Sequence, residues 1–154
     1  MYHASVSRSA LIDELDEVLL DVRHLFRTPE FRRLLLASIA DGVELSTLRL
    51  LRAVERHHGG PSVRDIAESL GVDPSTASRL VDNAARRGLL ARERRTDDAR
   101  RARLGLTEAG ATVLTEANGV RRELLARVTS DWSADETTSL IRLLRVLRDS
   151  FDRL

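Results

Sequence analysis

The amino-acid sequence predicts a mainly α-helical fold with one small β-hairpin, and three observations lead to that prediction. Apolar residues make up 42% of the 154 residues but aromatic residues only 3%, and the apolar ones are mostly Leu, Ala and Val, which favours helices over sheets. Apolar residues recur at three- and four-residue spacing, as they do in amphipathic helices. Residues 89–94 and 101–106 are short segments that can pair as strands across a polar turn.

Two helical segments are predicted in the first third of the chain. Thr28 and Pro29 end the first segment, residues 7–27, and begin the second, with Thr28 as its N-cap and Pro29 at its first position. The second segment, residues 29–40, is broken by Asp41-Gly42. The apolar stripe of the first segment consists of Leu11, Leu15, Val18, Leu19, Val22, Leu25 and Phe26.

The next two helices are marked by their capping residues. Ser46 is expected to be the N-cap of a helix that runs to about His57 and ends at Gly59-Gly60-Pro61. Ser62 caps the following short helix and forms a capping box with Asp65.

A tight turn joins this short helix to a longer one. Gly71 allows the left-handed backbone of such a turn, and Asp73 as N-cap followed by Pro74 is a strong helix start. The helix is predicted to run to Arg87 and to stop at Gly88. Two helices joined in this way and followed by a hairpin make a winged helix-turn-helix. The polar face of the second helix carries Ser75, Thr76, Ser78, Arg79, Asp82, Asn83 and Arg86.

Two long helices are expected after the hairpin. Thr107 caps the first, in which Gly110 and Gly119 are each expected to cost ~1 kcal/mol relative to Ala. Ser133 and Glu136 form a capping box at the start of the last helix. The apolar face of that last helix consists of Leu140, Leu143, Leu144, Leu147 and Phe151.

The helices at the two ends of the chain have apolar stripes but no complete bundle around them. Packing within one chain or against a second copy would cover these stripes. We expect a single domain over residues 1–154, with residues 7–40 and 107–153 forming a dimerisation region beside a lobe at 46–106. The residues expected at the dimer interface are Leu11, Leu15, Val18, Leu140, Leu144, Leu147 and Phe151.

Charge is distributed unevenly along the chain. The net charge is only +1, yet residues 86–103 contain eight Arg and three acidic residues. A local basic cluster on a nearly neutral protein indicates nucleic-acid contact, and a solvated charged face is the alternative. All 25 basic residues are Arg, so every charged phosphate contact would come from a guanidinium group.

A helix in the major groove presents its N-terminal residues to the base edges. Arg79 is able to make a bidentate contact with guanine, worth ~1–3 kcal/mol of discrimination. Alternatively, Arg79 binds only phosphate, or pairs with Asp82 or Asn83. In the predicted helix the N-terminal residues of the exposed face are Ser75, Thr76, Ser78 and Arg79.

Other classes of function are not favoured. The chain has no Cys, hence no disulfide and no thiolate metal site, and the adjacent His57 and His58 do not point the same way on a helix. We expect no enzyme activity and no cofactor, because no glycine-rich phosphate loop and no His beside a nucleophile and an orienting acid occur. The longest apolar run, residues 34–40, is too short to span a membrane, so a cytoplasmic protein without a membrane partner is expected.

Residues 44–154 resemble bacterial transcription regulators of the multiple-antibiotic-resistance regulator (MarR) family. The matching segments are LSTLRLL at 45–51, VRDIAESLGVDPSTASRLVDNAARRGLLAR at 63–92, DDARRARLGLTEAG at 97–110 and WSADE at 132–136. The resemblance implies an obligate homodimer that represses a nearby promoter until a small ligand or another signal releases it. In the family the wing Asp and Arg pair and the Arg reaches DNA, roles that fall here on Asp98 and Arg100. Arg101, where the family often has a small residue, and the additional helical piece at 29–40 depart from the family pattern.

The sequence therefore predicts a homodimeric DNA-binding regulator of transcription, a repressor of nearby genes or its own. Helix 74–87 would lie in the major groove of a pseudo-palindromic operator and wing 95–100 at the minor groove. Double-stranded DNA, a second copy of the chain and a small organic effector are the expected partners, and a winged-helix module that binds protein is the alternative. The residues expected to contact DNA are Ser62, Ser75, Thr76, Ser78, Arg79, Asn83, Arg86, Arg95, Arg100 and Arg101, with Asp98 stabilising the wing.

Overall fold

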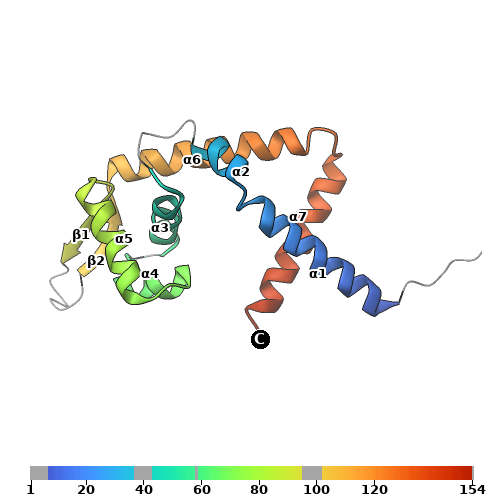
Figure 1. Cartoon of the computed structure of the whole chain (residues 1–154), viewed down its shortest axis with the longest axis horizontal. Coiled ribbons are helices and arrows are strands. Elements are labelled where there is room, and N and C mark those ends of the chain that lie inside the picture. The colour runs from blue at the N-terminus through green and yellow to red at the C-terminus, as the bar shows by residue number, and fades with distance from the viewer. Residues whose placement is uncertain (1–6, 37–42, 58, 95–101, 154) are drawn as a thin grey trace, which may run out of the picture. The chain divides into compact units, whose positions relative to one another are not determined.

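The structure is a computed structural model that describes residues 7–36, 43–57, 59–94 and 102–153 (Figure 1). The described residues form seven helices and one pair of strands, which confirms the predicted fold class. The chain divides into two compact units, Met1–Ala117 and Asn118–Leu154. The elements are α1 (Arg8–Leu25), α2 (Pro29–Leu36), α3 (Leu45–Arg56), α4 (Val63–Leu70), α5 (Pro74–Arg86), β1 (Leu90–Arg94), β2 (Ala102–Leu106), α6 (Glu108–Val128) and α7 (Ala134–Phe151).

The hydrophobic core of the first unit is shared by α3, α4, α5, the hairpin and the first turns of α6. Together α3, α4, α5 and the hairpin form a winged helix-turn-helix (Figure 1). Each of these elements contributes side chains that are almost completely removed from water, so apolar burial holds the lobe together. The largest of these side chains belong to Leu50, Leu51, Ile66, Val81, Leu104 and Leu114.

The hairpin has one face toward the helices. Its strands pair antiparallel, with Leu90 opposite Leu106 and Arg92 opposite Leu104. Leu90 and Leu104 are buried, and side chains two residues apart on a strand share a face. Arg92 therefore lies on the helix-facing side of the hairpin.

The capping signals predicted the helix starts correctly at five positions and wrongly at one. At each of the five, a side-chain oxygen of the capping residue accepts the expected backbone N–H. The turn after α4 is also as predicted, because Gly71 has a left-handed backbone with φ of 64°. Ser46 is not an N-cap, because α3 begins at Leu45 after Glu44, and the Ser46 hydroxyl donates to the Glu44 carboxylate at 3.1 Å. In α2 the predicted residues 37–40 lie outside the described part of the chain. The five confirmed N-caps are Thr28, Ser62, Asp73, Thr107 and Ser133.

Gly110 has a packing role that helix propensity alone does not predict. A Cβ atom at this position would lie 2.0 Å from the Leu89 carbonyl oxygen. Only glycine, which has no Cβ, therefore allows α6 to lie this close to the start of the hairpin. The same carbonyl accepts the backbone N–H of Thr107 at 3.2 Å, and the Thr107 hydroxyl donates to the Gly88 carbonyl at 2.6 Å. The end of α5, the start of β1 and the start of α6 therefore meet at one junction, formed by Gly88, Leu89, Thr107 and Gly110.

Neither α1 nor α7 buries a residue in the single chain. On α1, Leu11, Leu15 and Val18 are exposed by 43–52%. On α7, Leu140, Leu144 and Phe151 are exposed by 41–64%, and Leu147 is half-buried. Apolar surface of this extent is typical of an interface with another molecule.

Asp73 caps α5 through three hydrogen bonds. Its carboxylate accepts the backbone N–H of Thr76 at 2.8 Å and the hydroxyls of Ser75 and Thr76 at 2.5 and 2.6 Å. These bonds, with that of Ser75 the strongest influence, hold the pKa of Asp73 well below its ordinary value of 3.8. Asp73 is therefore a charged cap at the positive end of the α5 dipole.

We expect Gly110→Ala to destabilise the fold and Gly119→Ala to stabilise it. The new Cβ at 110 meets the Leu89 carbonyl oxygen, and overpacking of this kind costs about 1–3 kcal/mol. A Cβ at 119 meets nothing within 4 Å, so this control variant gains the ~1 kcal/mol by which Ala exceeds Gly in a helix. Urea unfolding measures both changes, and two equally stabilised variants would contradict the close approach at Gly110.

The cap at Asp73 predicts a pH-dependent stability. Asp73→Asn keeps a capping oxygen but has no titratable group. Because the pKa of Asp73 is lower in the folded state than its ordinary 3.8, the carboxylate stabilises the fold above pH 3.8, and this contribution disappears as the pH falls through the folded-state pKa. Wild type should therefore unfold at higher urea than the variant at neutral pH, with a difference that narrows below pH 3.8. A difference that does not change with pH contradicts the charged cap.

Candidate nucleic-acid interface

The two hydroxyls in the first turn of α5 present acceptors rather than donors to a ligand. The hydroxyl protons of Ser75 and Thr76 are both committed to the Asp73 carboxylate, so their oxygens retain only lone pairs for an outside partner. Such oxygens suit the amino groups of cytosine or adenine better than phosphate oxygens. This narrows the predicted DNA contact of Ser75 and Thr76 to groups that donate a hydrogen bond.

Further along the same face of α5, Arg79, Asn83 and Arg86 are exposed and Ser78 is half-buried. The Arg79 guanidinium donates to the Thr76 hydroxyl oxygen at 3.4 Å. The alternative in which Arg79 pairs with Asp82 is not what the structure shows, because Asp82 pairs with Arg92 of β1. The guanidinium of Arg79 is therefore directed along the exposed face.

Ser62 lies in the capping box of α4. Its backbone N–H and its hydroxyl donate to the Asp65 carboxylate at 2.8 and 2.9 Å. These bonds lower the pKa of Asp65, and the nearby charges of His57 and Arg103 lower it further. The Ser62 hydroxyl therefore has a structural partner, and its contact with DNA stays a prediction.

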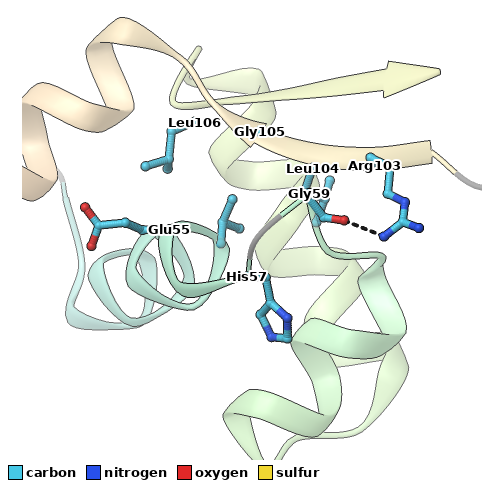
Figure 2. Close-up of a pocket in the computed structure, with 9 residues that line it drawn as sticks. Glu55, His57, Gly59, Arg103, Leu104, Gly105 and Leu106 are labelled. Atoms are coloured by element: carbon cyan, nitrogen blue, oxygen red, sulfur yellow. Dashed lines mark hydrogen bonds between the residues drawn. The ribbon is translucent and has the colours of Figure 1, made fainter. Parts of the chain in front are cut away.

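Four of the predicted interface residues, Arg95, Asp98, Arg100 and Arg101, lie outside the described residues. The part of the hairpin that the structure describes shows two arginines with internal partners instead. Arg92 forms the ion pair with Asp82. The Arg103 guanidinium donates to the Gly60 carbonyl at 2.7 Å (dashed line in Figure 2), beside a backbone bond from Leu104 N–H to the Pro61 carbonyl at 2.9 Å.

The charge count over residues 86–103 does not reveal these internal roles of Arg92 and Arg103, because it treats all the arginines there as one cluster. A signal for Arg92 was present. It stands two residues after Leu90, so strand alternation places it on the buried face. For Arg103 no local signal exists, because its partner Gly60 is 43 residues away.

A cavity of about 640 Å³ lies between the end of α3, the following loop and β2. Figure 2 shows that the side chains of Glu55, His57 and Arg103 at its margin point in different directions. They carry charges of both signs and do not gather around one point. The lining of this cavity therefore does not identify residues that would bind an effector, and the sequence identifies none either.

Two other features bear on the class of protein. Among the residues that the structure describes, no three His, Asp or Glu side chains are close enough to hold a metal ion together. None of the described helices has the length and hydropathy that a membrane crossing needs.

Comparison with known proteins gives consistent results. The model of the MarR family matches residues 41–101. The HTH-type transcriptional repressor MdtR of Bacillus subtilis is 32% identical over 95 residues, which cover 62% of this chain and 61% of MdtR, so the match spans less than two thirds of that relative.

Solved structures extend the likeness in fold to nearly the whole chain. A MarR family protein from Bacillus stearothermophilus has a TM-score of 0.82 at 23% identity, covering 96% of this chain and 99% of that one. The PcaV transcriptional regulator from Streptomyces coelicolor, solved with its natural ligand, has a TM-score of 0.58 at 25% identity, covering 95% and 97%. The MarR family model therefore matches the helix-turn-helix segment, and the winged-helix fold of the whole chain is similar to that of solved MarR family structures.

Proposed function

We propose that the protein is a homodimeric repressor that binds double-stranded DNA, with α5 in the major groove and the wing at the minor groove. The observation that carries the proposal is the exposed face of α5, where Arg79, Asn83 and Arg86 follow a charged N-terminal cap. A face that bound protein would be more apolar, whereas this one offers the guanidinium and amide groups that bind base edges and phosphates.

The second copy would cover the exposed apolar side chains of α1 and α7. Both helices lack buried residues in the single chain, and the dimer interface of an obligate homodimer resembles a hydrophobic core. A two-fold axis would place two α5 helices ~34–36 Å apart, which corresponds to the half-sites of a pseudo-palindromic operator.

Repression and its release are supported by relatives. MdtR is named as a transcriptional repressor, and PcaV is described in complex with its natural ligand. We propose that this protein represses nearby genes or its own in the cytoplasm, without enzyme activity or cofactor. A small organic ligand would release it from DNA by changing the separation of the two α5 helices.

Selection of genomic DNA fragments by the purified protein tests this proposal. Repeated recovery of one pseudo-palindromic sequence, bound with an affinity that falls steeply with salt, is the expected result. Recovery of no sequence, together with salt-independent or absent binding, would favour the protein-binding alternative. The genes beside the recovered operator would indicate the chemical class of the effector.

Arg79→Ala and Arg100→Ala should affect DNA binding differently. Loss of Arg79 removes a base contact, so we expect about a tenfold or greater loss on the operator and little on a scrambled duplex. Loss of Arg100 should weaken binding to both duplexes and reduce the salt slope by about 1. Arg33→Ala is the control, because this exposed Arg pairs with Glu30 on α2. Operator binding that is unchanged in both variants excludes the assigned roles.

Leu144→Glu should prevent dimerisation, because it places a charge among the exposed apolar side chains of α7. Thr138→Glu adds the same charge to the opposite side of that helix, where Thr138 is exposed, and should leave the dimer intact. Sedimentation equilibrium measures both, with helix content followed by circular dichroism. A Leu144→Glu variant that stays dimeric would show that this part of α7 is not the interface.

A further inference from the structure

The DNA-facing surface of α5 contains a carboxylate. Asp82 follows Arg79 by three residues and precedes Arg86 by four, and residues at these spacings are neighbours on one helix face. An unpaired carboxylate on this face would repel the phosphates that the arginines attract. A DNA-binding role for α5 therefore requires that the charge of Asp82 be compensated.

Arg92 of β1 supplies that compensation. Its guanidinium lies 2.5 Å from the Asp82 carboxylate, and the two side chains are exposed by 45% and 43%. Arg92 stands opposite the buried Leu104 in the hairpin register. Its backbone position therefore directs the side chain toward α5.

Removal of Arg92 would leave Asp82 with two alternative partners on its own helix. Arg79 at i−3 and Arg86 at i+4 are both exposed, and Asp–Arg pairs form readily at these spacings. Either pair would engage a guanidinium that the proposed function assigns to DNA.

We propose that Arg92 is a positioning residue for DNA recognition. It holds the Asp82 carboxylate at the hairpin and so keeps Arg79 and Arg86 available for bases and phosphates, without contacting DNA itself. This inference rests on the proposed function. It means that one arginine of the basic cluster at residues 86–103 has an internal role instead of a DNA contact.

The test compares four proteins: wild type, Arg92→Met, Asp82→Asn and the double variant. Methionine keeps the apolar stem of Arg92 and removes its charge. Each protein is titrated with the operator from the genomic selection and with a scrambled duplex, at several salt concentrations. Arg64→Met is the matched control, because Arg64 also forms an exposed ion pair, with Glu68 on α4. Thermal unfolding checks that every variant is folded, and Arg92→Lys, which keeps a cation beside Asp82, should bind like wild type.

We expect Arg92→Met to weaken operator binding about tenfold and the double variant to recover to within about threefold of wild type, with the wild-type salt slope. A double variant that stays as weak as Arg92→Met, with a slope smaller by about 1, would show that Arg92 contacts phosphate itself. Wild-type affinity of Arg92→Met would also overturn the inference. Absence of DNA binding by the wild type would instead contradict the proposed function.

Discussion

The close approach of α6 to the Leu89 carbonyl is the constraint on which the geometry of the lobe depends. Leu89 N–H closes the end of α5 by donating to Ala84 at 2.9 Å, while the Leu89 carbonyl accepts Thr107 N–H and leaves no space for a Cβ at Gly110. The end of α5, the start of β1 and the start of α6 are thereby held at one point. A movement of any of these three elements at this junction must therefore involve the other two.

The arginines of α5 and the hairpin discussed above fall into two groups by their partners. Arg92 of β1 neutralises the Asp82 carboxylate of α5, and Arg103 of β2 donates to the Gly60 carbonyl. Each strand of the hairpin is thereby attached to a different part of the lobe. Arg79 and Arg86 are exposed on α5. The internal pairs hold the hairpin in place, and the exposed arginines are the ones that the proposed function assigns to phosphates and bases.

The fold class and most helix boundaries could be predicted because their signals are local. A capping bond such as Ser62 to Asp65 or Ser133 to Glu136 joins residues three apart, so the sequence alone contains both partners. Ser46 was the exception, because the helix begins one residue before it, after Glu44, and the Ser46 hydroxyl bonds to the Glu44 carboxylate instead of capping.

The candidate site was harder to predict because its key contacts join distant residues. Asp82 and Arg92 are ten positions apart and Arg103 and Gly60 are 43 apart, so only the assembled hairpin brings them together. The steric need for glycine at 110 likewise arises from Leu89, in another element. Helix propensity alone predicted a cost there and could not foresee that packing reverses its sign.

Hydroxyl-radical footprinting of the operator complex tests most directly the central claim that paired winged helix-turn-helix lobes bind DNA. Two protected segments, related by a two-fold axis and with centres ~34–36 Å apart along the duplex, are the predicted result. A single protected segment, or protection without two-fold symmetry, would contradict a dimer that places one α5 in each of two successive major grooves.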